Sequence, residues 1–259
     1  MIVLIGSAAM IVIACIAILV MYREAHENNV KTHVVHVSGL EQSVHLFFIS
    51  DTHTRAIDHA MIAAIQPVDA VIIGGDFVDR RTSTETLLKN VQILKTLGPI
   101  YFVWGNNDRE LPEEELLSIF REAHVTVIEN DAVLLEQLKH PLWLSAIDYV
   151  AEPRPDNIEK AFAKCEMART IFVAHNPQVF PKVRAYYRPL LMMGGHLHGG
   201  QIRFGPFGMH TPGSFKERGG IPTLISNGYG TSLLPLRFGA KPECHVITMN
   251  FADDSPKNE

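Results

Sequence analysis

Five apolar runs in this sequence stop abruptly at glycine and polar residues, and this arrangement constrains the fold more than any other feature. The residues that follow the runs are Ser50-Asp51-Thr52-His53, Gly74-Gly75-Asp76, Gly105-Asn106-Asn107-Asp108, His175-Asn176-Pro177 and Gly194-Gly195-His196-Leu197-His198. An apolar run that ends in this way is typical of a buried strand that enters a tight loop. Because sites in α/β folds lie at the carboxyl ends of strands, we expect these polar groups to meet.

Helical spacing between several of these strands indicates an α/β fold. The sequence predicts strands at 34–37, 44–49, 70–73, 100–104, 170–174, 189–193, 223–226 and 245–250, and helices at 57–65, 84–97, 112–123 and 157–164. Three further strand-like runs, at 125–128, 132–138 and 142–147, follow one another with little helix between them and predict a second sheet. No linker divides the region from 32 to 252, so we expect one domain there.

The N-terminal residues 2–21 carry no charged side chain. About 20 apolar residues at ~1.5 Å per residue span the ~30 Å hydrocarbon core of a bilayer. A cleaved signal peptide is the alternative, but the charged n-region is absent and no small-x-small cleavage site follows Tyr22. We therefore expect a single-pass cell-membrane anchor at 1–22, a juxtamembrane linker at 23–31 and a polar tail at 253–259. Arg23 and Lys31 favour a cytoplasmic main domain without fixing its side.

Charge and cysteine content exclude several classes of function. The formal net charge of −5 argues against a general nucleic-acid partner, which would need a basic surface. The three cysteines, Cys15, Cys165 and Cys244, have no metal-like spacing and imply no disulfide framework. Neither observation excludes an enzyme that binds phosphates through metal ions.

The strand-end groups are all oxygen or imidazole donors. They are Asp51, His53, Asp76, Asn106, His175, His196 and His198. Such a set suits Mn²⁺, Fe²⁺ or Zn²⁺ and is unlike a cysteine-type structural zinc site. Seven protein ligands are too many for one catalytic ion but suit two ions that share a carboxylate. A pair of ions about 3.5–4 Å apart can clamp a phosphoryl group and activate a water molecule.

These motifs, in this order, resemble those of the calcineurin-like metallophosphoesterases. The matching blocks are Asp51-Thr52-His53, Gly74-Gly75-Asp76-Phe77-Val78-Asp79, Gly105-Asn106-Asn107-Asp108, Ala174-His175-Asn176-Pro177 and Gly195-His196-Leu197-His198. Downstream, 227–232 and 234–237 resemble the bacterial membrane-associated phosphodiesterase branch of this family. The resemblance implies a four-layer αββα sandwich, in which two mixed β-sheets are flanked by helices.

The same resemblance implies a ligand set for each of two metal ions. The first ion would be held by Asp51, His53, Asp76 and His198, and the second by Asp76, Asn106, His175 and His196. Mn²⁺ is the expected metal, with Fe²⁺ and Zn²⁺ as alternatives, and the implied nucleophile is a metal-bridging hydroxide. Asp79 is expected to form a hydrogen bond near the site and not to be a ligand.

The sequence departs from the family at Asn107, where a histidine is common. An asparagine amide can donate a hydrogen bond to a phosphate oxygen but cannot act as a general acid near neutral pH. We therefore expect a preference for pyrophosphates or other activated diesters, with Asn107 and Asp108 as candidate catalytic residues. Arg55 and Arg109 adjoin the motifs and are candidates to bind substrate phosphate, although ordinary surface arginines would fit equally well.

Three functions remain open at this point. The leading one is a membrane-anchored hydrolase of phosphodiester or pyrophosphate bonds, acting on a lipid-linked substrate such as a UDP-diacylglucosamine-type glycolipid precursor. The second is a non-catalytic scaffold of the same fold that binds a protein partner, and the third is a phosphomonoesterase. The sequence leaves the oligomeric state undetermined.

Overall fold

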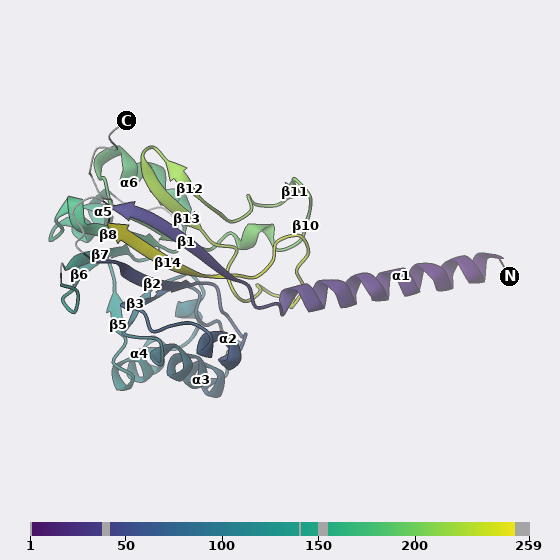
Figure 1. Cartoon of the computed structure of the whole chain (residues 1–259). Helices are drawn as coiled ribbons and strands as arrows, with labels where there is room; N and C mark the ends of the chain where they lie inside the picture. The colour runs from purple at the N-terminus through teal and green to yellow at the C-terminus, as the bar shows by residue number, and fades with distance from the viewer. Residues whose placement is uncertain (1, 38–41, 140, 150–154, 252–259) are drawn as a thin grey trace.

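The computed structural model describes residues 2–37, 42–139, 141–149 and 155–251 (Figure 1). The helices are α1 (Ile2–Ala25), α2 (His59–Ala63), α3 (Thr84–Lys95), α4 (Glu113–Glu122), α5 (Pro155–Phe162) and α6 (Phe180–Tyr186). The strands are β1 (Val30–Val37), β2 (Val44–Ile49), β3 (Ala70–Gly74), β4 (Ile100–Val103), β5 (Thr126–Ile128), β6 (Asp131–Leu135), β7 (Leu142–Ile147), β8 (Thr170–Ala174), β9 (Leu191–Gly194), β10 (Arg203–Phe204), β11 (Phe207–Gly208), β12 (Ser214–Arg218), β13 (Ile221–Ile225) and β14 (Cys244–Phe251).

Most strands belong to two six-stranded mixed sheets. Sheet A has the order β1-β14-β2-β3-β4-β5, and sheet B has the order β12-β13-β9-β8-β7-β6. Four neighbouring strands are parallel in each sheet, β2 to β5 in sheet A and β13, β9, β8 and β7 in sheet B. A two-stranded hairpin, β10–β11, extends from the domain (Figure 1).

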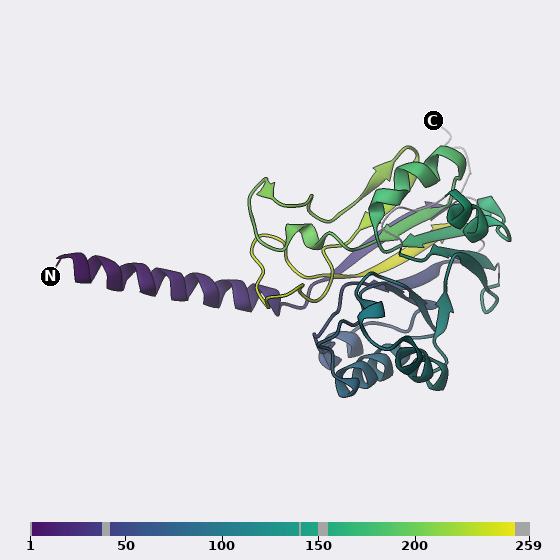
Figure 2. The same ribbon diagram turned by 180° about the vertical axis from the view of Figure 1, so that it is seen from behind.

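Three apolar clusters separate four layers, as the alternation of side chains along β2 illustrates. Leu46 and Phe48 face the cluster between the sheets, whereas Phe47 and Ile49 face the cluster beneath α2, α3 and α4. The outer face of sheet B packs on α5 and α6 (Figure 2). Because successive side chains of a strand point to opposite faces, a strand in a sheet covered on both sides is apolar along its length, as β3 is. This αββα arrangement confirms the predicted fold class.

Strand direction places the site at the end of the domain from which α1 leaves. β14 is parallel to β1 and antiparallel to β2, so the carboxyl end of β2 lies beside the start of β1. His245 on β14 pairs with Lys31 on β1 and with Phe48 on β2, so Lys31 and Phe48 lie at the same level of the sheet. Asp51 follows Phe48 by three residues, roughly 10 Å further along the strand direction. The polar loops after β2, β3 and β4 therefore lie at the level where α1 ends.

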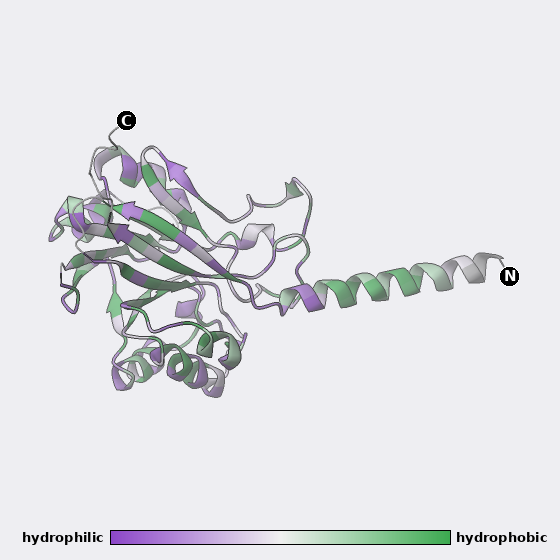
Figure 3. Cartoon of the chain, viewed as in Figure 1, coloured by the Kyte–Doolittle hydropathy of each residue, from purple (hydrophilic) through white to green (hydrophobic). Residues whose placement is uncertain are grey.

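α1 is an apolar helix that projects away from the domain (Figure 3). Its segment Gly6–Ala25 has a mean hydropathy of 2.0 and is exposed from residue 6 to residue 20, so the helix could cross a membrane by length and composition. The helix runs to Ala25, three residues beyond the predicted anchor, because Tyr22, Arg23 and Glu24 contain no helix breaker. The chain from α1 to β1 is correspondingly short, and the backbone N–H of Arg237 donates to the carbonyl of Met21 (3.0 Å).

One predicted strand lies in the other sheet, and four short elements were not predicted. The segment 125–128 was expected in the second sheet, but β5 pairs with β4 and belongs to sheet A, because α4 returns the chain to that edge. The sequence did not predict α6, β10, β11 or β12, which are short and carry little apolar periodicity. The predicted polar tail at 253–259 lies outside the described residues.

Candidate metal centre

The seven predicted ligand residues lie in loops that follow β2, β3, β4, β8 and β9. Five of them have a backbone φ between 48° and 71°: Asp51, His53, Asp76, His196 and His198. A left-handed backbone costs free energy in any residue with a Cβ, and Asp, Asn and His tolerate it better than most. The rest of the fold thus holds these loops in tight turns at the shared edge of the two sheets.

One cluster joins sheet A to sheet B through Asp51, His53 and His198, which are all buried and have candidate ligand atoms within 4.8 Å of one another. Nε2 of His53 lies 3.3 Å from Nε2 of His198, which in turn lies 3.4 Å from Oδ1 of Asp51. Two ring nitrogens and a carboxylate oxygen that face one another form a donor set for a borderline divalent ion.

A second cluster consists of Asp76, His175 and His196, again within 4.8 Å of one another. Nε2 of His175 lies 3.3 Å from Oδ2 of Asp76 and 3.2 Å from Nδ1 of His196. The same His175 nitrogen is 4.0 Å from Oδ1 of Asp51, so the two clusters are neighbours. The structure therefore brings six of the seven predicted ligands together as two candidate metal sites.

Asn106 is the seventh predicted ligand, and only one of the two polar atoms of its side chain has a hydrogen-bond partner. Its Nδ2 donates to Oδ1 of Asn107 (2.7 Å), whereas its buried Oδ1 has no hydrogen-bond partner. A buried carbonyl oxygen without a partner is costly, and a metal ion would satisfy it. The site also lacks room for larger neighbours, since a Cβ on Gly195 would lie 2.3 Å from Oδ2 of Asp51.

Contacts behind the imidazoles fix their orientation. Nδ1 of His175 donates to the carbonyl of Gly74 (2.9 Å), which leaves Nε2 as the free lone pair of the neutral ring. Nδ1 of His53 lies 3.5 Å from Oδ2 of Asp79. Arg81 forms a 2.6 Å ion pair with the same carboxylate.

Electrostatics at the site favour a bound cation. Burial opposes protonation of His175, but Asp76 and Asp51 beside it raise its pKa to about 10. Burial, and then the Arg237 guanidinium, hold the pKa of His198 well below its ordinary value. In the absence of an ion, the carboxylates of Asp76 and Asp51 thus hold a proton on His175, whereas His198 is a neutral ring with one nitrogen lone pair available. The donor set, the charge and the unpaired Asn106 oxygen all fit divalent metal ions.

Asp108, a candidate catalytic residue, is fully buried beneath the loops. Its carboxylate accepts hydrogen bonds from the backbone N–H groups of Asp76 (2.8 Å), Gly105 (2.7 Å) and Val78 (3.1 Å). Burial, and then the charge of Asp76, raise its pKa to about 7. This geometry favours a positioning role, in which Asp108 ties the loop after β3 to the loop after β4, over contact with a substrate.

Asn107 lies at the half-buried mouth of the site. Its backbone N–H donates to Oδ1 of Asp76 (2.7 Å), and its side-chain Nδ2 donates to Oε1 of Glu110 (3.0 Å). The side chain is therefore beside the second cluster, at the position where the sequence predicts contact with substrate. Tyr149 lies nearby, with its ring centroid 5.6 Å from that of His196.

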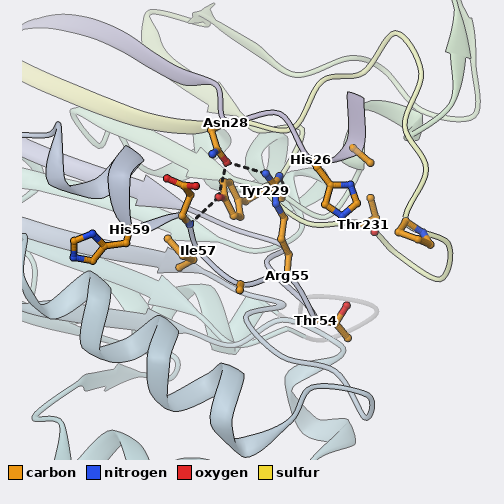
Figure 4. A pocket seen from close by; sticks show the side chains of 12 residues that line it. His26, Asn28, Thr54, Arg55, Ile57, His59, Tyr229 and Thr231 are labelled. Atoms are coloured by element: carbon orange, nitrogen blue, oxygen red, sulfur yellow. Dashed lines mark hydrogen bonds between the residues drawn. The ribbon is translucent and has the colours of Figure 1, made fainter. Parts of the chain in front are cut away.

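Arg55 lines a separate cavity of about 610 Å³ at the base of α1 (Figure 4). Its guanidinium donates to the carbonyls of Tyr229 (2.6 Å) and Glu27 (2.9 Å) and to Oδ1 of Asn28 (2.8 Å). The described residues that line this cavity include none of the seven predicted ligands. The contacts give Arg55 a role in holding the junction with α1 and do not favour the predicted phosphate contact.

Arg109 is also committed to protein partners. Its guanidinium lies over the Trp104 ring, 4.3 Å from the centroid, and forms ion pairs with Glu113 (2.6 Å) and Asp148 (2.9 Å). Phosphate binding by Arg109 would have to compete with these carboxylates, so this predicted role receives no support from the geometry either.

Comparison with known proteins identifies the family. Residues 44–204 match the family model described as the calcineurin-like phosphoesterase superfamily domain, a span that holds all seven predicted ligands. The chain belongs to the calcineurin-like phosphoesterases. Membership supports a metal-dependent hydrolase of phosphoesters, and the two clusters described above are the candidate binding sites for its divalent metals.

Relatives of this phosphoesterase occur in Bacillus subtilis. The chain is 36% identical over 235 residues to the uncharacterized protein YpbG, covering 88% of this chain and 90% of that protein. It is 26% identical over 223 residues to the uncharacterized metallophosphoesterase YkoQ, covering 78% of this chain and 82% of the relative. Among solved structures, TT1561 of Thermus thermophilus shares the fold, with a TM-score of 0.50 at 11% identity over 71% of this chain and 89% of the other.

Arg237 is a site residue that sequence reasoning missed. Its side chain is fully buried and donates to the carbonyls of Gly230 (2.6 Å), Asn227 (2.7 Å) and His198 (3.2 Å). Nη2 of Arg237 also lies 3.2 Å from Nδ1 of His198. The sequence signal was an arginine at the end of an apolar stretch, Leu234-Pro235-Leu236-Arg237. Such a pattern predicts that the arginine is buried, but it does not predict which residues bind it.

Proposed function

We propose that this phosphoesterase is a membrane-anchored hydrolase of phosphodiester or pyrophosphate bonds that uses two divalent metal ions. The observation that carries the proposal is the adjacency of the two clusters, with Oδ1 of Asp51 4.0 Å from Nε2 of His175. The first ion would be held by Asp51, His53, Asp76 and His198. The second would be held by Asp76, Asn106, His175 and His196. When bound, such ions neutralise phosphate charge and lower the pKa of a water molecule.

The chain's own residues would set how the phosphate lies at the site. Asn107 is beside the second cluster and could donate a hydrogen bond from Nδ2 to a phosphate oxygen in place of Glu110. Since an amide supplies no proton, we propose that the favoured leaving groups are those that depart as stable anions, such as a phosphate of a pyrophosphate bond. The preference for diesters and anhydrides follows from this absence of a general acid at position 107.

The membrane part of the proposal rests on α1. Its apolar segment Gly6–Ala25, exposed over most of its length, suits a single bilayer crossing, and the loops of the site lie at the end of the domain that carries it. A site in that place favours a lipid-linked substrate, such as a UDP-diacylglucosamine-type glycolipid precursor. We propose Mn²⁺ as the metal, with Fe²⁺ and Zn²⁺ as alternatives.

Turnover and metal content of the full chain in detergent test the proposal. We expect hydrolysis of bis(p-nitrophenyl) phosphate that depends on Mn²⁺, and about two metal ions per chain. The Asp76→Asn variant should lose both the hydrolysis and the bound metal. The Asp156→Asn variant, a matched change at an exposed carboxylate of α5, should keep both. Absence of turnover and of bound metal with Mn²⁺, Fe²⁺ and Zn²⁺ would instead support the non-catalytic scaffold.

A further inference from the structure

Five large apolar side chains are exposed near the site, and we call them the apolar rim. They are Phe204, Phe207, Met209, Leu233 and Leu234, each between 62% and 85% exposed. Three belong to the β10–β11 hairpin and the residue after it, and two belong to the loop that precedes Arg237. Exposed apolar groups that gather at one place mark a surface that contacts a partner or a membrane.

The rim is at the same end of the domain as α1. The hairpin reaches out to the level at which α1 begins to leave the domain (Figures 1 and 2). The chain that carries Leu233 and Leu234 is joined to α1 three residues after Leu234, by the hydrogen bond from the Arg237 backbone N–H to the Met21 carbonyl (3.0 Å). The rim is thus continuous with the helix proposed to enter the bilayer, and this continuity favours lipid as its occupant.

The exposed hairpin is held firmly by a buried arginine at its base. Arg203 donates from its guanidinium to the carbonyls of Gly199 (2.9 Å), Gly205 (3.0 Å) and His210 (3.0 Å). The rings of Phe204 and Phe238 pack with centroids 5.1 Å apart. The hairpin therefore keeps Phe207 and Met209 exposed to water, although the hydrophobic effect favours burial of such side chains.

The other half of the rim is tied directly to the metal centre. Gln201, three residues after His198, donates from Nε2 to the carbonyls of Ser232 (3.0 Å) and Leu234 (3.1 Å). On the opposite side, Arg81 donates to the carbonyl of Leu233 (2.7 Å) and pairs with Asp79, the support of His53. The loop that carries Leu233 and Leu234 thus lies between the two ligand-bearing loops.

We propose that the apolar rim inserts into the lipid interface beside α1 and sets the metal centre against the bilayer surface, so that the phosphoester is taken from a lipid headgroup. This inference rests on the proposed function for the anchor and the hydrolysis, and it adds a second membrane contact that orients the site. Aromatic and aliphatic side chains of this kind are the ones that bind at the interfacial depth of a bilayer.

Tryptophan quenching tests the insertion in the full chain reconstituted into phosphatidylcholine vesicles with bromine at carbons 6 and 7. We expect Phe207→Trp and Leu234→Trp to be quenched several-fold more than Tyr186→Trp, after subtraction of the two native tryptophans. Tyr186 is an equally exposed aromatic residue on α6, at the far end of the domain (Figure 1). Tyr22→Trp, at the end of α1, reports separately on the anchor.

Each outcome of the quenching experiment decides the inference. Quenching at Tyr22→Trp without quenching at Phe207→Trp overturns it while leaving the anchor intact, and this result is also expected if the rim packs on a second copy of the chain. Equal quenching at Tyr186→Trp indicates adsorption without orientation and overturns it as well. Absence of quenching at all four positions overturns both the anchor and the inference.

Turnover of two matched esters gives an independent test. One probe is bis(p-nitrophenyl) phosphate in water, and the other is a p-nitrophenyl diacylglyceryl phosphodiester in vesicles. We expect Phe207→Ser with Leu234→Ser to lower turnover of the lipid ester about tenfold and to leave the soluble ester unchanged. Equal loss on both esters, or loss on neither, overturns the inference. Absence of turnover of both by the wild type would count against the proposed function, and the quenching result would still decide the membrane contact.

Discussion

Sheets A and B resemble each other in size and strand direction but bring different chemistry to their shared edge. Each has four neighbouring parallel strands, and the carboxyl ends of these strands meet at the site. Sheet A supplies Asp51, His53, Asp76 and Asn106, and sheet B supplies only the imidazoles of His175, His196 and His198. All the negative charge among the predicted ligands thus comes from sheet A. We therefore expect removal of a ligand from sheet A and removal of one from sheet B to have different effects on metal binding and turnover.

The largest expected difference is between Asp76→Asn and His175→Gln. Asp76→Asn removes a negative charge proposed to serve both ions and should lower kcat/KM for bis(p-nitrophenyl) phosphate by about 10³-fold or more. His175→Gln removes a neutral donor from one cluster and should lower the metal content by about one ion per chain. Metal analysis together with kinetics distinguishes the two, and equal metal loss in both variants would contradict the division of charge between the sheets.

Asn107→His adds to sheet A the group that the family commonly places there. We expect turnover of esters with poor leaving groups to rise by about 10²-fold, because an imidazolium can protonate the departing oxygen. Turnover of p-nitrophenyl esters should change little. The measurement is the dependence of rate on leaving-group pKa, and an equally steep dependence in wild type and Asn107→His would rule out the proposed role of Asn107.

Asp79→Asn tests whether support behind an imidazole differs between the sheets. Burial opposes ionisation of Asp79, but hydrogen bonds from His53 and Arg81 hold its pKa below its ordinary value, so the carboxylate is charged at neutral pH. Its loss should weaken metal binding by about tenfold. His175, from sheet B, is instead supported by the backbone carbonyl of Gly74 at the end of β3, which no substitution removes. Metal titration monitors the effect, and Asp69→Asn, at a loop before β3, serves as the matched control.

The smallest expected effect concerns His245, which joins the sheets away from the site. Its ring contacts His33 on β1 and Ser226 after β13, and burial lowers its pKa to about 3. Between about pH 3 and about pH 6.5 the unfolded chain binds a proton that the folded chain excludes, so the free energy of unfolding falls as pH falls. From about pH 6.5 to about pH 5.5, wild type should lose about 1 kcal/mol more than His245→Gln. Denaturation in detergent measures this, with His36→Gln, at an exposed position of β1, as the control.

The sequence was most informative where apolar runs were long and bounded. β2, β7 and β8 begin and end where their composition predicts, because a strand buried on both faces is mostly apolar and contrasts with the polar residues around it. Short elements on the surface, such as α6 and the β10–β11 hairpin, lack that contrast with their surroundings.

Ligand identity could be predicted from the sequence, whereas the surroundings of the ligands could not. Spacing reveals which polar residues follow strands, and the family resemblance groups them around two ions. The contacts of Arg237 with His198 and of Arg81 with Leu233 join segments 39 and 152 residues apart, and only the folded chain brings these together. The predicted phosphate contacts of Arg55 and Arg109 lack support for a related reason, since each arginine has a protein partner distant in sequence, Tyr229 for Arg55 and Asp148 for Arg109.

The left-handed backbone at five ligand positions has a consequence for how this scaffold can evolve. Asp51, His53, Asp76, His196 and His198 occupy a conformation that asparagine and glycine also adopt readily. A single base change converts an aspartate or histidine codon to one for asparagine, so a descendant could lose its ligands one at a time while its loops kept their shape. Inheritance of the fold therefore gives no assurance of inherited chemistry, and a lost activity could be regained by one reversion.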